Sequence, residues 1–268
     1  MGQVTARRRV LRLDATTRRG VQRPDTLAVE QPLEIQVGGS PVTITMRTPG
    51  ADLDLVPGWL VAEGVVTGPH DIVSMTTCAE STVDVTLAPG VAPPRPRAFA
   101  TTSACGVCGA QSLAEVRAHH RWDVGGDETS VSAEVLATLP GTLREAQRAF
   151  DATGGLHAAG LFTSTGDLLL LREDVGRHNA LDKVVGAALR DGRLPLRGHV
   201  LLVSGRASFE LTAKALAAGA PLLAAVSAPS TLAVDLAQEA GLTLVGFLRG
   251  PSMNVYAGAH RVVLGARD

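Results

Sequence analysis

The feature that most constrains the fold is the regular alternation of helical and strand patterns after residue 132. The first helical stretch reaches Ala149, with an expected break near Pro140 and Gly141, and glycines at 154 and 155 end it. A strand hairpin at 156–162 and 167–172 follows, and then helices at 180–190, 208–218 and 230–240 alternate with strands at 199–204, 221–227 and 242–248. Because each later crossover passes through a helix, the sequence predicts a three-layer α/β domain whose strands are mostly parallel.

This order of elements resembles the cytidine deaminase-like fold. Zinc-dependent deaminases carry His or Cys with a nearby Glu at the start of one helix and a Cys pair at the start of the next. Here the corresponding helix starts read HNAL at 178–181 and SGRAS at 204–208, without the glutamate or the cysteines. We therefore expect the deaminase-like scaffold without deaminase chemistry.

The first half of the chain is rich in strand patterns. Residues 33–37 and 42–46 alternate across a Gly-Gly-Ser-Pro turn and predict a hairpin, residues 52–64 predict a helix, and residues 83–87 predict another strand. We expect three parts: a disordered basic tail over 1–24, a β-rich subdomain over 25–130, and the deaminase-like α/β domain over 131–268.

Two of the three cysteines, Cys105 and Cys108, lie two residues apart in the stretch TTSACGVCG at 101–109. A proline-rich segment precedes the pair, and residues 110–120 predict a short amphipathic helix after it. The pair is thus expected on a loop that leads into a helix N-terminus, where the helix dipole favours the thiolate over the thiol.

Several chemistries are open to this pair. A structural zinc site needs four ligands, and no second Cys or His pair exists, so Cys78 and His119 or His120 would have to complete it. A thioredoxin-like dithiol usually follows a strand and has bulkier residues between its cysteines. The flanking glycines instead favour a sterically open nucleophile that handles sulfur on a flexible loop, and a pair without any chemical role is the remaining alternative.

Composition limits the classes of protein. Aromatic residues make up 3%, and basic residues cluster only before residue 24, which argues against a nucleic-acid partner. No apolar run approaches the roughly 20 residues that cross a membrane, and the arginines at 7–9 lack the apolar stretch of an export signal. Three cysteines and a net charge of −1 fit a soluble protein in the reducing cytoplasm.

The loops that follow the predicted parallel strands are suited to anions. They read REDVGRHN at 172–179, SGRAS at 204–208, SAPST at 227–231 and FLRGPS at 247–252. Helix N-termini, hydroxyls and arginine forks bind phosphate oxygens. In the alternative interpretation Ser208 and Ser230 are only helix caps, and Glu173, Asp174 and Arg177 are only a surface ion-pair cluster. Four such loops at one sheet edge favour a nucleotide or another phosphorylated ligand.

Four motifs resemble the FdhD family of sulfur carriers that formate dehydrogenases require: CGVCG at 105–109, EDVGRHNALDK at 173–183, VSGRAS at 203–208, and GFLRG at 246–250 with NVY at 254–256. The resemblance covers about residues 25–265. It implies that a cysteine desulfurase loads sulfur onto the protein as a persulfide. The sulfur then passes to the molybdenum of a bis(molybdopterin guanine dinucleotide) cofactor before this cofactor enters formate dehydrogenase.

By this resemblance Cys105 is the persulfide-bearing nucleophile and Cys108 the assisting thiol. The cofactor-binding segment, which contacts the guanine dinucleotide end, would consist of Phe247, Leu248, Arg249, Gly250, Pro251 and Ser252. Family members often have an acidic residue or glycine and then arginine where this chain has Pro251 and Ser252, so Arg249 or Arg206 is expected to carry more of the phosphate contact. The resemblance also implies a homodimer, no resident metal, and transient cofactor binding that GDP would mimic.

Overall fold

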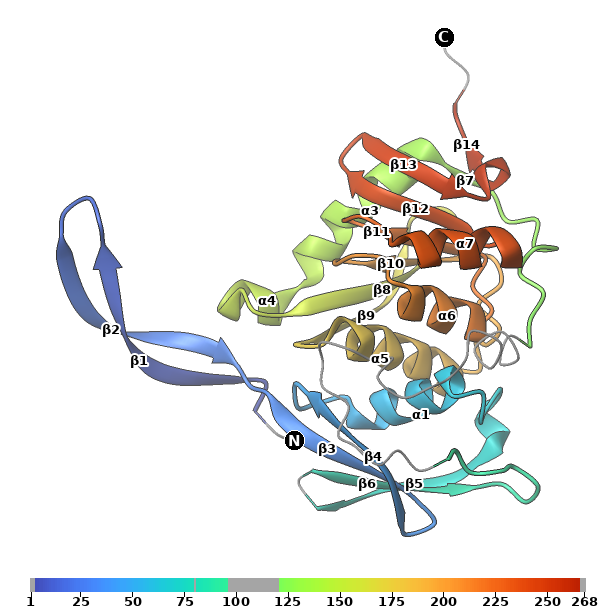
Figure 1. Cartoon of the computed structure of the whole chain (residues 1–268), viewed down its shortest axis with the longest axis horizontal. Helices are drawn as coiled ribbons and strands as arrows, with labels where there is room; N and C mark the ends of the chain where they lie inside the picture. Colours follow the sequence, from blue (N-terminus) through green and yellow to red (C-terminus); the bar gives the residue numbers. More distant parts are fainter. Residues whose placement is uncertain (1–2, 80, 96–120, 266–268) are drawn as a thin grey trace.

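The computed structural model describes residues 3–79, 81–95 and 121–265 (Figure 1). The cysteine pair at 105 and 108 and the helix expected at 110–120 lie outside these residues. No helix in the described ranges is long and apolar enough to cross a membrane.

A six-stranded mixed sheet forms the centre of the second half, in the order β13-β12-β11-β10-β8-β9. Strands β10, β11 and β12 are parallel neighbours, whereas β8 is antiparallel to β9 and β10, and β13 is antiparallel to β12. The strands are β8 (His157–Thr163), β9 (Leu168–Asp174), β10 (His199–Val203), β11 (Leu222–Ala225), β12 (Thr243–Arg249) and β13 (Ser252–Ala257). The predicted α/β class is confirmed, and the likeness to deaminases remains a prediction.

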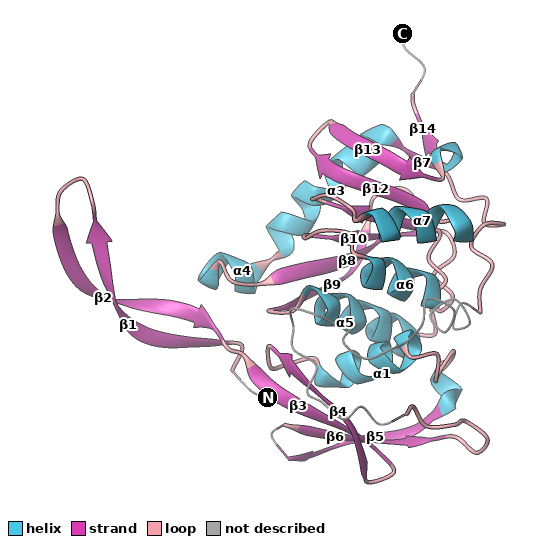
Figure 2. Ribbon diagram, in the orientation of Figure 1, coloured by secondary structure: helices cyan, strands magenta, loops and turns pink. Residues whose placement is uncertain are grey.

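Helices cover both faces of this sheet (Figure 2). Along β10, Leu201 and Val203 belong to the apolar cluster that includes α5, α6 and α7, while Val200 and Leu202 belong to the cluster with α3. Successive strand residues face opposite sides, so this alternation produces the three layers. The helices are α3 (Ala133–Ala146), α4 (Arg148–Thr153), α5 (Arg177–Arg190), α6 (Phe209–Ala217) and α7 (Thr231–Ala240).

Side-chain capping explains the starts of α3, α6 and α7. The hydroxyls of Ser208 and Ser230 accept hydrogen bonds from amides three residues on, which confirms both as caps. Helix α5 starts at Arg177, three residues before its predicted start; its N-cap is Gly176, and the Asn179 side chain donates to the Met46 carbonyl. The predicted break at Pro140 is also wrong, because α3 continues through it with its apolar stripe buried on the sheet.

The first half builds a four-stranded sheet, in the order β4-β3-β6-β5, with α1 between it and α5 (Figure 1). The predicted hairpin is β3 with β4, and β5 is a strand that the sequence did not predict. The elements are β3 (Gln31–Val37), β4 (Ser40–Arg47), α1 (Asp52–Ala62), β5 (Ile72–Ala79) and β6 (Thr82–Leu87). Short pieces complete the described fold: η1 (Pro69–Asp71), β7 (Val131–Ser132), η2 (Ala259–Arg261) and β14 (Val262–Val263).

Helices α1 and α5 cross at two glycines. A Cβ on Gly58 would lie 1.8 Å from the carbonyl oxygen of Asp182, and a Cβ on Gly186 would lie 1.8 Å from that of Asp54. The two backbones therefore touch, and one hydrophobic cluster runs from the four-stranded sheet through α1 and α5 to the central sheet. The proposed boundary near residue 130 remains a prediction, but the two halves share this core.

Residues 5–28 form a two-stranded arm that extends away from the body (Figure 1). Strands β1 (Thr5–Asp14) and β2 (Arg19–Ala28) pair without interruption, which corrects the expectation of a disordered tail over 1–24. The Asp14 carboxylate accepts the amide hydrogens of Thr16 and Thr17 and so fixes the turn. The arginine-rich composition suggested a disordered segment, but strand pairing depends on how the two strands align, which composition does not show.

Candidate functional site

The loops predicted to converge do lie along one edge of the central sheet. The amide of Ser227 donates to the Gly205 carbonyl at 3.2 Å, and the amide of Phe247 donates to the Ser227 carbonyl at 3.1 Å. These bonds join the ends of β10, β11 and β12 in series. Because β8 is antiparallel to β10, its first residue, His157, lies at the same edge. This edge is where parallel α/β sheets bind their ligands.

The expected cofactor-binding segment is the distorted end of β12 and the turn into β13. The pairing register shifts between Gly246 and Arg249, and Phe247 has a positive φ of 50°. Its ring is 37% exposed, and the Arg249 guanidinium lies over it at 5.4 Å from the ring centre. The Arg249 Nε donates to the Val226 carbonyl at 3.0 Å. A flat aromatic face and an oriented cation are therefore presented together to solvent.

The other residues of this segment differ in what they can offer a ligand. Gly250, Pro251 and Ser252 are exposed at the turn, whereas the Leu248 side chain is fully buried in the core. Only the backbone of Leu248 can take part in binding. A Cβ on the preceding Gly246 would lie 2.9 Å from the Pro229 ring, so a glycine there allows the close approach of the β11 and β12 loops.

Arg206 lies at the end of β10 and is exposed. Its loop is held by the Ser204 hydroxyl, which accepts the amide hydrogen of Ala158 at 2.9 Å. Among the described residues, none forms a hydrogen bond or ion pair with the Arg206 side chain, so its charge is available to an anionic ligand. Arg206 and Arg249 thus belong to loops joined through the β11 loop, as the sequence predicted.

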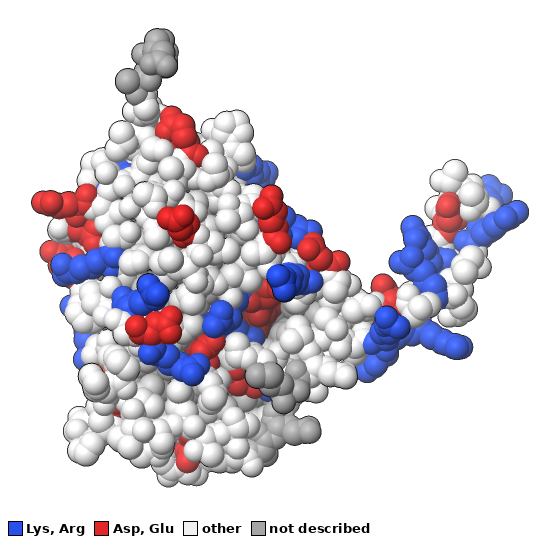
Figure 3. Space-filling view, turned by 180° about the vertical axis from the view of Figure 1, so that it is seen from behind, with Lys and Arg blue, Asp and Glu red and all other residues white. Residues whose placement is uncertain are grey.

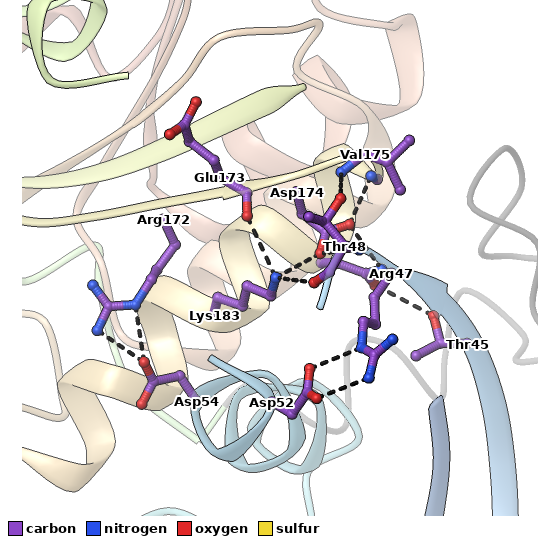
Figure 4. Close-up of polar contacts among 12 residues, drawn as sticks. Thr45, Arg47, Thr48, Asp52, Asp54, Arg172, Glu173, Asp174, Val175 and Lys183 are labelled. Carbon is purple, nitrogen blue, oxygen red and sulfur yellow. Dashed lines mark hydrogen bonds and ion pairs between the residues drawn. The ribbon is translucent and has the colours of Figure 1, made fainter. Parts of the chain in front are cut away.

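Asp174 of the 173–183 motif points inward, toward Lys183 and Thr48 (Figure 4). The Asp174 carboxylate is fully buried, accepts the amide hydrogens of Thr48 and Gly176, and lies 2.7 Å from the Lys183 ammonium. Lys183 also donates to the Thr48 carbonyl at 2.9 Å. The pair therefore connects the end of β4 to α5 and joins the two halves of the molecule.

Two further residues of this motif bond backbone groups, and one of them, Asn179, also links the two halves. Glu173 accepts the amide hydrogens of Ala149 and Phe150 at the start of α4, and the Asn179 amide donates to the Met46 carbonyl at 2.7 Å. The alternative of a surface ion-pair cluster is therefore wrong for these acids. They satisfy backbone groups that burial would otherwise leave unpaired.

Sequence reasoning missed a polar cluster between α5 and α6. His178 Nε2 lies 3.2 Å from the Glu210 carboxylate, and the Lys214 ammonium bonds both oxygens of Asp182 at 2.8 and 2.9 Å. On each helix the two residues are four apart, a spacing that places them on one face, and this spacing was the signal available in the sequence. The cluster lies beneath the Ser208 loop, because His178 is also 3.4 Å from the Ser208 hydroxyl.

Burial sets the protonation of this cluster. Burial, helped by the charges of Lys214 and Arg177, lowers the pKa of His178 to about 3 and outweighs the nearby Glu210 carboxylate. Burial also raises the pKa of Asp182 to about 6, although Lys214 acts in the opposite direction. At the sheet edge, burial and the Arg177 charge lower the pKa of His157. Both imidazoles are therefore neutral near pH 7.

The structure does not test the expectations for the cysteine pair or for a metal site. Cys105 and Cys108 are outside the described residues, and Cys78 is an exposed free cysteine on β5. Within the described ranges, no group of three or more His, Cys, Asp or Glu side chains is placed to hold a metal ion.

Comparisons with known proteins give a consistent result over nearly the whole chain. The model of the FdhD/NarQ family matches residues 28–263. Proteins named sulfur carrier protein FdhD are similar to this chain: 57% identity in Nocardia farcinica, over 97% of this chain and 96% of that protein, and 55% in Mycobacterium tuberculosis, over 98% and 100%. The one from Streptomyces coelicolor is 57% identical over 99% of this chain and 98% of its own.

A solved structure has the same fold. A crystal structure described as that of a formate dehydrogenase accessory protein from Desulfotalea psychrophila superimposes with a TM-score of 0.79 at 20% identity. The superposition covers 97% of this chain and all of the other. At this identity the likeness concerns the fold, and it includes both halves of the molecule.

Proposed function

The chain belongs to the FdhD/NarQ family, and on this premise we propose that it carries persulfide sulfur to the molybdenum cofactor of formate dehydrogenase. The donor is a cysteine desulfurase, and the acceptor is molybdenum in bis(molybdopterin guanine dinucleotide). The observation that supports this most strongly is the sheet edge where Arg206, Phe247 and Arg249 are presented together, because such an edge suits a nucleotide-bearing ligand. The cofactor is a substrate here and leaves with its sulfur.

The sulfur step uses Cys105 as the nucleophile. Its thiolate attacks the outer sulfur of the donor's persulfide, the donor's S–S bond breaks, and the donor leaves as a thiolate. Cys105 then holds the sulfur as a persulfide, which ionises more readily than a thiol. Cys108 can attack the inner sulfur after delivery fails or stalls, which forms a disulfide and releases hydrosulfide. We place this chemistry in the cytoplasm, where thiols remain reduced.

The nucleotide end of the cofactor is proposed to bind along the ends of β10 to β12. The Arg206 and Arg249 guanidinium groups supply charge-assisted contacts to phosphate oxygens, and the exposed Phe247 ring offers a face for the guanine. The turn formed by Gly250, Pro251 and Ser252 contributes the backbone amide of Gly250 and the hydroxyl of Ser252 in place of the arginine that relatives often have. The segment itself carries one cation, Arg249, and the neighbouring β10 loop adds a second, Arg206.

Calorimetric titration with GDP tests this placement. Replacing Arg249 with Ala removes one contact worth about 1.5–3 kcal/mol, so GDP affinity should fall at least about tenfold. Arg197→Ala is the matched control, because Arg197 is exposed before the amino end of β10, at the opposite edge of the sheet. Equal affinities of the wild type and the Arg249 variant would remove Arg249 from the site.

Two readouts separate this function from the zinc alternative. Persulfide loading at Cys105 should be unchanged in the Arg249→Ala protein, because loading and cofactor binding use different parts of the chain. A purified protein with a zinc-to-protein ratio near one, and without sulfur loading, would favour a structural zinc site at Cys105 and Cys108 instead.

A further inference from the structure

One group of side chains, at the edge of the central sheet where β10, β11 and β12 end, has no part in the function proposed above. Arg177 is the first residue of α5, and His157 is the first residue of β8. Both lie against Gly205, in the loop after β10. A Cβ on Gly205 would lie 3.5 Å from two ring atoms of His157 and 3.8 Å from the Cδ of Arg177. Two side chains from different elements therefore meet over backbone that carries no side chain.

The Arg177 side chain has no partner among the described residues. Its Nε atom is buried, and no described acceptor lies within hydrogen-bond distance of it. The ion pairs within the described ranges all belong to other side chains. Buried donors are nearly always paired in native proteins. An arginine held in this way therefore indicates an acceptor that a ligand brings.

The acids around this group are already paired. Asp174 lies opposite His157 in the pairing of β8 with β9, and the Asp174 carboxylate is 2.7 Å from the Lys183 ammonium. The Glu210 carboxylate lies 3.2 Å from His178 Nε2. The guanidinium charge at the start of α5 is therefore not balanced by these acids.

The overall charge of the body does not select anions. On the face of the body that Figure 3 shows, acidic and basic side chains are interspersed, and basic side chains dominate only on the arm. The whole chain carries a net charge of −1. An anion that binds the body is therefore recognised by a local arrangement of donors rather than by a broad field.

The start of α5 adds local donors. This helix is 14 residues long, its N-cap is Gly176, and no side chain caps it. The amides of a first helical turn and the positive end of the helix dipole favour an oxyanion. Arg177 belongs to that first turn. The helix start and the buried Nε atom are independent features, and both favour the same kind of ligand.

We propose that Arg177 and the first turn of α5 bind a tetrahedral oxyanion, such as a phosphate group, over Gly205 and beside His157. The guanidinium supplies the charge and the Nε donor, and the backbone amides supply further donors. The site is distinct from the contacts proposed for Arg206 and Arg249. It goes beyond the proposed function, because it needs neither sulfur transfer nor guanine. The oxyanion is either free or part of a nucleotide, and competition separates these two sources.

His157 reports on the occupancy of this site. Burial and the Arg177 charge lower the pKa of His157, whereas Asp174 acts in the opposite direction. Of the other groups near the imidazole, His178 on α5 is neutral near pH 7, and Gly205 has no side chain. An oxyanion next to Arg177 offsets its charge and favours the imidazolium, so binding should raise the pKa of His157.

Nuclear magnetic resonance of the full-length protein with isotope-labelled histidine tests the site. The probe is inorganic sulfate, whose charge does not change over the pH range in which histidine titrates. The His157 signal, assigned from a His157→Gln variant, should shift and saturate as sulfate replaces chloride at constant ionic strength, and the pKa of His157 should rise. In Arg177→Gln, sulfate affinity should fall at least about tenfold. Arg23→Gln is the matched control, because it removes the same charge from the exposed arm and should respond as the wild type does.

A conservative variant keeps the test valid if Arg177→Gln does not fold, which circular dichroism checks. Arg177→Lys retains the charge without the planar fork, so its sulfate affinity should lie between that of the wild type and that of Arg177→Gln. A His157 signal that does not respond to sulfate would overturn the proposal. So would equal responses of the arginine, lysine and glutamine forms.

Competition with GDP identifies the source of the oxyanion and separates this proposal from the proposed function. Displacement of sulfate by GDP would place a nucleotide phosphate in the site, whereas sulfate that still binds beside GDP would make a free oxyanion the ligand. Sulfate binding through Arg177 in a protein that does not bind GDP would support this site and contradict the nucleotide part of the proposed function. GDP binding that depends on Arg249, without any response to sulfate, would do the reverse.

Discussion

Replacing Lys183 with Met should be among the most destabilising single changes in this protein. The Lys183 ammonium lies 2.7 Å from the Asp174 carboxylate, and their side chains are 2% and 0% exposed. Removing one partner of a buried ion pair leaves an uncompensated charge and costs about 3–5 kcal/mol. Asp174 retains hydrogen bonds from two backbone amides and from the Asn179 amide, which offset part of the loss. We therefore expect a loss of about 3 kcal/mol.

Urea unfolding followed by tryptophan fluorescence measures this loss. Trp59 is a suitable probe because it is 8% exposed on α1, in the core that the two halves share. Arg193→Met is the control: its pair with Asp191 is 3.5 Å long and about half exposed, so it should cost less than about 1 kcal/mol. If the Lys183 variant also loses less than about 1 kcal/mol, the pair does not hold the two halves together.

Two further changes test the helix crossing and the buried cluster. Gly186→Ala should destabilise the protein because its Cβ would overlap the Asp54 carbonyl. Gly141→Ala is the control: the new Cβ has open space on α3, so this change should be neutral or stabilising by up to about 1 kcal/mol. Equal shifts of the two urea midpoints would contradict this. The pKa of His178 in the folded protein, about 3, lies below its value in the unfolded chain. The contribution of the neutral imidazole to the free energy of unfolding is therefore fully present above about pH 6.5, and it falls by about 2 kcal/mol when the pH decreases to 5. His178→Gln should lose that component, and an unchanged dependence of unfolding free energy on pH would place the proton elsewhere.

Local signals predicted the parts of the fold that depend on neighbouring residues. Ser208 and Ser230 cap α6 and α7 because a hydroxyl before an apolar helical stretch bonds the free amides of its own first turn. The alternation of these helices with apolar strands placed the loops of Arg206 and Arg249 at one edge, because parallel strands end on the same side.

Long-range pairing could not be predicted in the same way. Strand β13 and the two strands of the arm form by pairing with other strands, and the sequence does not show in which register they pair. Asp174 points inward because Thr48 and Lys183 bind its carboxylate there. A motif of charged residues suggests solvent or ligand contact when it is considered alone. Only the position of the first half over α5 shows that Asp174 and its partner Lys183 connect the two halves.

The most direct test of sulfur carriage is the intact mass of the protein after incubation with a cysteine desulfurase and cysteine. The wild type and Cys78→Ala should gain the mass of one sulfur atom, and dithiothreitol should remove it. Cys105→Ala should gain none and should remain folded. A wild type that gains no sulfur, or a Cys105→Ala protein that still gains it and still activates formate dehydrogenase, would contradict the role of Cys105 as the sulfur-carrying residue.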